Sequence, residues 1–90
     1  TLVIAPNTTF RLKGYANAKT VVLAGDFNNW SPNGFTMQKQ GNEWIIEQHL
    51  LPGKHQYKFV VDGKWIVDPA NELREPNEFG EENSVLWKNE

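Results

Sequence analysis

Short runs of alternating apolar and polar residues recur along this chain, separated by Gly, Pro, Asn and Asp. Strand-like runs rich in β-branched and aromatic residues return roughly every 8–12 residues, and no window carries a helical stripe. The predicted strands are Leu2–Ile4, Thr8–Lys13, Thr20–Gly25, Phe35–Lys39, Glu43–Leu50, His55–Val61, Lys64–Asp68 and Ser84–Lys88. This spacing predicts an all-β fold, an antiparallel sandwich of immunoglobulin-like type.

The clearest local prediction is a hairpin around Asp62-Gly63, a dipeptide that favours the positive φ angles of a two-residue type I′ turn. In that register, alternate residues of the two arms fall on opposite faces of the sheet. One face holds Tyr57, Phe59 and Ile66, and the other holds Lys58, Val60 and Trp65. We expect the first face to be core and the second to place an ammonium diagonal to an indole. A three-residue turn would instead shift the register and separate them.

The four tryptophans fall into two groups. Trp44 and Trp87 lie inside alternating runs, so we expect both to be core residues. Trp30 and Trp65 lie at the edges of turns with little apolar company, which suggests a surface that stacks on something flat. The alternative is that each of these two rings folds over the end of the sandwich.

Three further residues are candidates for binding. Lys58 interrupts an apolar run and is expected to face solvent or a polar ligand, unless it protects an edge strand. The amide of Asn83 offers a donor and an acceptor to vicinal hydroxyls, although turn formation also explains it. Phe79 lies in Asn71–Ser84, a stretch with five glutamates that we expect to be an irregular loop. Its ring either tucks onto the sandwich or projects as a ligand contact.

Length and charge narrow the possible partners. The chain has 90 residues and a formal net charge of -2, which favours a single module over residues 1–90. The acidic balance argues against a nucleic acid partner. No apolar run approaches the ~20 residues of a membrane span, so we expect no membrane partner. Because the sequence begins at Thr1 without an initiator methionine, we expect the module to be part of a longer polypeptide of unassigned compartment.

The residues that carry chemistry do not combine into a predicted active site. Asp26, Asp62 and Asp68 lie at strand ends and turns, where aspartate commonly bonds the backbone. Ser31 and Ser84 have no histidine with an obvious claim to activate them. The chain has no cysteine, and its two histidines lack partners at metal-ligand spacing. We therefore expect a binding module with no catalytic residue, no metal and no cofactor.

Nearly the whole chain from Thr8 to Lys88 resembles a known family. The motifs that carry the resemblance are Leu23–Ser31, Leu51–Trp65, Asp68-Pro69 and Asn83. Their joint spacing is similar to that of the glycogen-binding domains of AMP-activated protein kinase β subunits. More broadly it is similar to the family 48 carbohydrate-binding modules found beside the catalytic barrels of branching and debranching enzymes.

The resemblance implies an immunoglobulin-like sandwich of the early-set type that binds α-1,4-linked glucans and has no catalysis of its own. It implies aromatic platforms at Trp30 and Trp65, a hydroxyl donor at Lys58 and an amide contact at Asn83. Phe79 stands where the kinase domains carry a leucine that enters a cyclic glucan, which favours an exposed ring. Glu81 stands where a threonine contact is usual.

From the residues and the resemblance together we expect a non-catalytic module that binds glycogen or starch and tethers a larger enzyme or assembly to the polysaccharide. Its partners would be α-glucan polysaccharides or oligosaccharides and the covalently linked domains of the parent protein, for example as an accessory domain of a glycoside hydrolase. The alternative is a domain of the same fold that packs on a neighbouring catalytic domain without binding sugar.

Overall fold

The computed structural model describes residues 5–89, and the regular elements of that range are strands joined in antiparallel pairs. They are β1 (Thr8–Lys13), β2 (Val21–Gly25), β3 (Phe35–Thr36), β4 (Gln38–Gln40), β5 (Glu43–Gln48), β6 (Gly53–Val61), β7 (Lys64–Ile66), β8 (Arg74–Pro76) and β9 (Glu82–Lys88). The predicted strand Leu2–Ile4 lies outside the described residues. Within residues 5–89, no helix is long and apolar enough to cross a bilayer.

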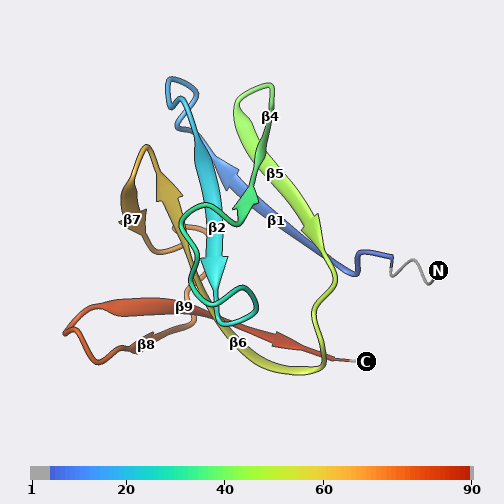
Figure 1. Ribbon diagram of the computed structural model, residues 1–90, viewed down its shortest axis with the longest axis vertical. Coiled ribbons are helices and arrows are strands. Elements are labelled where there is room, and N and C mark those ends of the chain that lie inside the picture. The colour runs from blue at the N-terminus through green and yellow to red at the C-terminus, as the bar shows by residue number, and fades with distance from the viewer. Residues whose placement is uncertain (1–4, 90) are drawn as a thin grey trace.

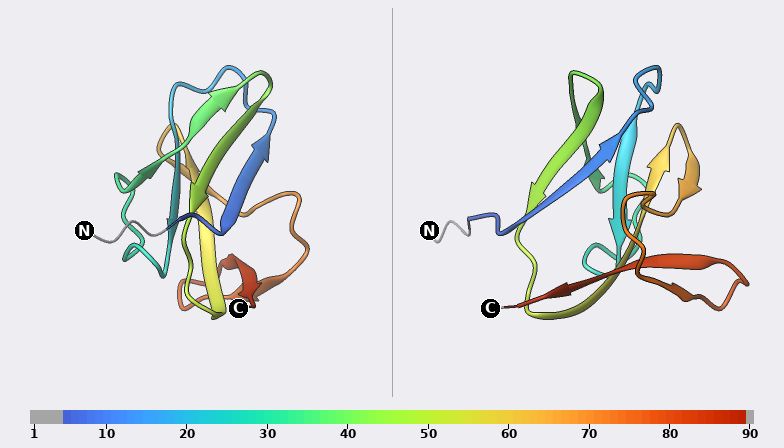
Figure 2. Two further views of the ribbon diagram at one scale, coloured as in Figure 1. Left: turned by 90° about the vertical axis from the view of Figure 1, so that its right-hand side faces the viewer. Right: turned by 180° about the vertical axis from the view of Figure 1, so that it is seen from behind.

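The strands form two sheets that face each other (Figures 1 and 2). The smaller sheet has the order β1-β5-β4, and the larger has the order β3-β2-β6-β9-β8, with β7 also paired to β6. Two facing antiparallel sheets bury one side of each strand, which accounts for the period-2 pattern of the sequence. The predicted all-β, immunoglobulin-like antiparallel sandwich is confirmed.

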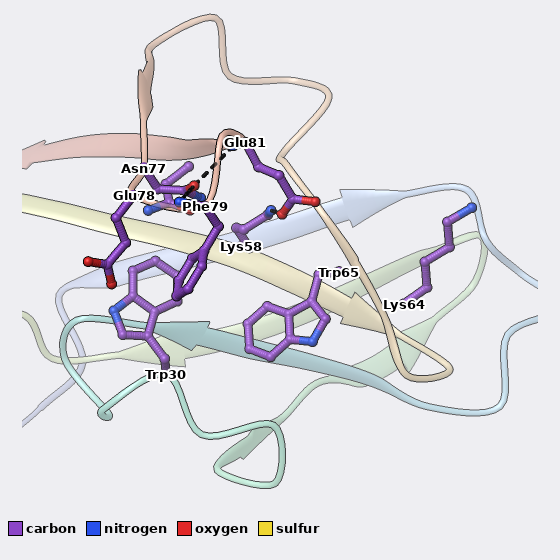
Figure 3. A pocket seen from close by; sticks show the side chains of 9 residues that line it. Trp30, Lys58, Lys64, Trp65, Asn77, Glu78, Phe79 and Glu81 are labelled. Carbon is purple, nitrogen blue, oxygen red and sulfur yellow. Dashed lines mark hydrogen bonds and ion pairs between the residues drawn. The ribbon is translucent and has the colours of Figure 1, made fainter.

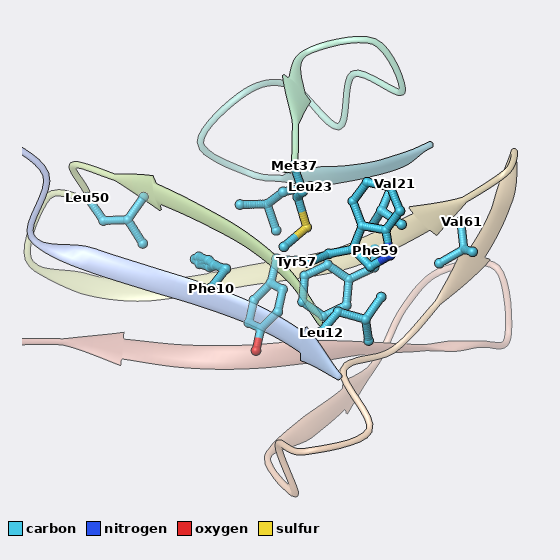
Figure 4. Close-up of a cluster of buried hydrophobic side chains, with 10 residues drawn as sticks. Phe10, Leu12, Val21, Leu23, Met37, Leu50, Tyr57, Phe59 and Val61 are labelled. Atoms are coloured by element: carbon cyan, nitrogen blue, oxygen red, sulfur yellow. The ribbon is translucent and has the colours of Figure 1, made fainter. Parts of the chain in front are cut away.

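The core fills the space between the two sheets (Figure 4). Its rings and aliphatic chains come from both layers: Phe10, Leu12, Val21, Leu23, Met37, Trp44, Leu50, Tyr57, Phe59 and Val61. Trp44 is 6% exposed, and its indole Nε1 donates to the carbonyl of Tyr15 at 3.1 Å, so its polar edge is paired inside the protein. The prediction that Trp44 is a core residue is confirmed.

The Asp62-Gly63 hairpin forms as predicted. Both residues have positive φ, 49° and 87°, as a type I′ turn requires. The register pairs Phe59 with Ile66 and Val60 with Trp65. Phe59 is fully buried between the sheets, so Trp65 lies on the other side of the larger sheet, called here the outer face.

The long central strand β6 changes partners along one of its edges. From Gly53 to Tyr57 it pairs with β9, and from Phe59 to Val61 it pairs with β7. Lys58 lies between the two pairings, where the sheet divides, and its neighbour on the other edge is Ala24 of β2. The division and the small side chain of Ala24 leave room above Lys58 on the outer face.

Two predicted elements are wrong in detail. Asn71–Ser84 is not entirely a loop, because β8 pairs with β9 within it. Pro76 is tolerated there because β8 is the last strand of its sheet, where a missing backbone donor breaks no ladder. The predicted strand Phe35–Lys39 is interrupted at Met37, because β3 and β4 belong to different sheets.

Trp87 is not a core residue, and that prediction is wrong. Its side chain is 61% exposed. The next residue inward on β9, Leu86, packs against the core, so alternation turns Trp87 to the outer face. Alternation correctly grouped Trp87 with Val85, but of these two residues only Val85 is buried, at 3% exposed.

Candidate functional site

All five residues proposed from the sequence line one hollow of about 700 Å³ on the outer face (Figure 3). The hollow includes Lys58, which lies between the part of β6 that pairs with β9 and the part that pairs with β7. The five are Trp30, Lys58, Trp65, Phe79 and Asn83, and the remaining lining residues are Lys64, Asn77, Glu78 and Glu81. Residues from four separate stretches of the chain therefore meet at one place.

Trp30 is held by a tightly bonded loop after β2. The side chain of Asn28 accepts from the N–H of Gly25 at 3.0 Å and donates to the carbonyl of Leu23 at 3.0 Å. Trp30 itself has a φ of 57°, an unusual conformation for a bulky residue, and its N–H donates to the Gly25 carbonyl at 2.9 Å. The indole packs on a small apolar cluster of Val22, Ala24 and Val60. Local backbone strain is thus held in place by the Asn28 contacts, as is common at binding sites.

Trp65 is presented by the rigid hairpin of β6 and β7. It lies opposite Val60 on the outer face and is 39% exposed. The alternative, that this ring folds over the end of the sandwich, is wrong, because the ring stands on the sheet surface beside the hollow. Trp30 and Trp65 therefore present two ring faces to the same space.

Lys58 forms the charged floor of the hollow. It is only 7% exposed, and its Nζ lies 3.2 Å from Oε1 of Glu81. Because β6 is an interior strand of its sheet, the edge-protection alternative for Lys58 is wrong. Among residues 5–89, one of the three donors of the ammonium is used by Glu81, and two remain for other acceptors.

Asn83 stands beside Lys58 at the start of β9. Its Nδ2 donates to Oε1 of Gln56 at 2.9 Å, and its Oδ1 accepts from Nδ2 of Asn77 at 3.1 Å. The amide is 7% exposed and held on both sides. One N–H and one lone pair are left over, which suits a fixed contact to neighbouring hydroxyls.

Phe79 projects from the loop between β8 and β9 and is 80% exposed. Asn77 shapes that loop, because its Oδ1 accepts from the N–H groups of both Phe79 and Glu81, at 2.9 and 3.1 Å. Gly80 completes the turn with a φ of 80°. The expectation of an exposed Phe79 is confirmed, and the alternative, that its ring packs onto the sandwich, is wrong.

Asn77 is the site residue that the sequence analysis missed. Its signal was an asparagine three residues before a glycine, the pattern of a side chain that caps its own turn. By bonding Phe79, Glu81 and Asn83 together it fixes three lining residues at once.

The aspartates at the predicted turns form hydrogen bonds that stabilise the fold. Asp26 accepts from the N–H of Gln56 at 2.9 Å, and Asp62 accepts from two N–H groups of the β1–β2 loop. Asp68 accepts from the hydroxyl of Tyr57 at 2.7 Å. Burial, together with that contact to Asp68, raises the pKa of Tyr57 above its usual range, even though a hydrogen bond from Asn71 acts in the opposite direction. The turn interpretation of all three aspartates is confirmed.

Comparison with known proteins places this chain in a family. Residues 7–88 match the family described as the glycogen recognition site of AMP-activated protein kinase. The 5'-AMP-activated protein kinase subunit beta-1 of Sus scrofa is 38% identical over 79 residues, covering 88% of this chain and 61% of that sequence. The Homo sapiens subunit beta-1 is 38% identical over the same length, covering 27% of that sequence. The chain thus spans less than two thirds of the length of these relatives.

A solved structure shares the fold of this chain. The crystal structure of the maltogenic amylase from S. marinus superposes with a TM-score of 0.79 at 26% identity, covering 91% of this chain and 13% of that chain. The likeness is therefore to one part of a much longer enzyme. Because the family match spans almost all 90 residues, the chain belongs to the family of glycogen recognition sites of AMP-activated protein kinase, which are non-catalytic carbohydrate-binding modules.

Proposed function

We propose that residues 1–90 form a single module that binds α-1,4-linked glucans such as glycogen or starch in the hollow on the outer face. The observation that carries the proposal is the meeting of Trp30, Lys58, Trp65, Phe79 and Asn83 in that one hollow. By its family, the module is attached to a larger protein, and we propose that it tethers this protein to the polysaccharide.

The chemistry of the hollow suits a glucose chain. The faces of pyranose rings expose C–H groups, and Trp30 and Trp65 offer flat apolar surfaces against which these groups lose water. Lys58 and Asn83 then supply spare donors and one acceptor for hydroxyls, which fixes the orientation of the sugar. Phe79, on the facing loop, adds an apolar contact from the opposite wall.

The bonds within the site indicate that little of it must reorganise on binding. Asn28 fixes the loop of Trp30 and Asn77 fixes the loop of Phe79. A preorganised site loses less conformational entropy when the ligand binds. The hollow is nevertheless open and has few polar contacts, so we expect modest affinity.

Isothermal titration with maltoheptaose and β-cyclodextrin tests the proposal. We expect dissociation constants on the order of 10 μM to 1 mM, about -4 to -7 kcal/mol. Cellohexaose is the matched control, because its β-linked ribbon is flat and does not follow a curved aromatic site, and it should bind much more weakly. No heat at millimolar α-glucan would overturn the proposal in favour of a domain that only packs on a neighbour.

A further inference from the structure

Trp87 is an exposed aromatic residue outside the hollow. It is 61% exposed near the end of β9, where it pairs with Lys54 of β6. Because residues alternate along a strand, Asn83, Val85 and Trp87 share the outer face. The four residue-to-residue steps from Asn83 to Trp87 span about 13 Å at the usual rise of a strand. Trp87 therefore lies on the same side of the sheet as the hollow and a short distance beyond it.

A continuous row of polar side chains connects Asn83 to Trp87. Asn83 donates to Gln56 at 2.9 Å, and Gln56 Nε2 donates to Oε1 of Glu75 at 3.4 Å. Glu75 forms an ion pair with Lys54. The Nζ of Lys54 in turn lies 6.0 Å from the centre of the Trp87 ring. We call Gln56, Glu75, Lys54 and Trp87 the strip.

The strip repeats the chemistry of the hollow. In the hollow, indole rings stand beside an amide and the ion pair of Lys58 with Glu81. In the strip, an indole stands beside an amide and the ion pair of Lys54 with Glu75. The side chains of Lys54 and Glu75 are 33% and 40% exposed, so both reach solvent and can bond a ligand. Ammonium donors and carboxylate acceptors around an exposed ring suit a polyhydroxylated ligand better than a purely apolar partner.

We infer that the strip is a second stretch of the glucan surface, which binds more distant glucose units of a chain whose end or bend occupies the hollow. Trp87 is its platform, and Lys54 and Glu75 contact hydroxyls. This inference rests on the proposed function, and it adds that the module prefers long α-1,4 chains to compact ones. The continuity of the strip with Asn83 is what favours a glucan over a neighbouring protein domain as the occupant.

Ligand length separates the strip from the hollow in an experiment. Short-chain amylose can cover both, whereas β-cyclodextrin is compact and can occupy only the hollow. Trp87→Ala should weaken amylose binding about threefold to tenfold, as expected for loss of one aromatic contact, and leave β-cyclodextrin binding unchanged. Trp87→Phe should keep most of the amylose affinity. Tyr15→Ala is the matched control, because Tyr15 is also an exposed aromatic (46%) but belongs to the loop between β1 and β2.

Each outcome decides between the ideas. Unchanged amylose affinity in Trp87→Ala overturns the strip while wild-type binding still supports the hollow. Equal losses for amylose and β-cyclodextrin also overturn it, because they show that Trp87 acts through the shape of the hollow. Wild-type protein that binds neither ligand overturns the proposed function itself. A further readout is the indole N–H signal of Trp87 in NMR spectra, which should shift with amylose and not with β-cyclodextrin.

Discussion

Aromatic side chains lie on both sides of the larger sheet, but their surroundings differ. On the inner face, Tyr57 packs its ring 5.0 Å from that of Phe10 and 5.8 Å from that of Phe59, between centroids. On the outer face, Trp65 and Phe79 are 39% and 80% exposed around an open hollow. Aromatic rings thus serve as core in one region and as a ligand surface in the other. The type of residue does not decide between these roles. The side of the sheet toward which the backbone directs the ring decides between them.

The contrast is sharpest at Lys58, which stands in sequence between Tyr57 and Phe59. Its neighbours are buried in the core, while its own ammonium meets Glu81 on the outer face. A shift of register by one residue would exchange these two environments and bury an unpaired charge. The hairpin at Asp62-Gly63 prevents this shift, and so the fold and the site depend on the same turn.

The largest expected effect is a loss of stability from a substitution in the core between the two sheets. Trp44→Ala removes a buried indole and its bond to the Tyr15 carbonyl, and should lower the free energy of unfolding by about 3–5 kcal/mol. Chemical denaturation measures this loss. The fraction that remains folded should bind maltoheptaose as the wild type does, because Trp44 lies between the sheets, away from the hollow.

The outer region should show the reverse behaviour. Trp65→Ala should lose roughly 1.5–3 kcal/mol of glucan binding, at least tenfold, because an exposed platform that lines the hollow is removed. Its melting temperature should change little. Glucan titration and thermal denaturation should both be measured on Trp65→Ala and on Trp44→Ala, so that binding and stability are compared in the same two variants. If Trp65→Ala unfolded the domain while Trp44→Ala left it intact, the assignment of the two faces would be wrong.

The sequence predicted the inner and outer faces where the determining contacts are local. The hairpin turn, the alternation through Phe59 and the outward Trp65 all follow from a few adjacent residues. The same local reasoning placed Trp30 and Phe79 at turns. Only the family resemblance predicted that they meet in one hollow, because no single segment of the sequence determines how distant strands pair.

The errors arose where distant pairing decides the outcome. Alternation correctly grouped Val85 with Trp87, and Val85 is buried, but Trp87 lies beyond the part of β9 that pairs with β8 and is left 61% exposed. The short strand β8 has a weak local signal because its edge position tolerates proline and glutamate. Asn77 was missed because its importance lies in a bond to Asn83 across the hairpin.

Phe79 sharpens the comparison within the outer face. Its ring is 80% exposed on the facing loop, so Phe79→Ala should leave stability unchanged. Binding of cyclic glucans should fall by about 1–2 kcal/mol and binding of linear ones by less, because only a ring offers a central apolar hole for the side chain to enter. Parallel titrations with β-cyclodextrin and maltoheptaose measure the difference. Equal losses would reduce Phe79 to a general contact at the rim.

The smallest expected effect concerns His55, near the start of β6, whose ring lies edge-on to that of Phe27 with 6.0 Å between the centroids. Burial alone would lower the pKa of His55, but the carbonyl of Leu51 at 2.7 Å and the carboxylate of Asp26 at 3.0 Å raise it above 6.5 overall. Both ring nitrogens face oxygen acceptors, so only the doubly protonated imidazolium donates to both. The folded state therefore holds the proton more tightly than the unfolded state does.

The sign of the pH effect follows from that raised pKa. The stabilisation by His55 is fully present below the unfolded pKa of about 6.5 and is lost as pH rises through the higher folded value. Urea denaturation at pH 6 and at pH 8.5 should show lower stability at the higher pH, and His55→Gln should abolish most of the difference. His49→Gln is the matched control, and it should leave the difference in place. Because His55 faces the interior and lies outside the hollow, glucan affinity should stay constant over the same range. An affinity that changed together with stability would mean that the two faces of β6 are coupled, against the separation of roles drawn above.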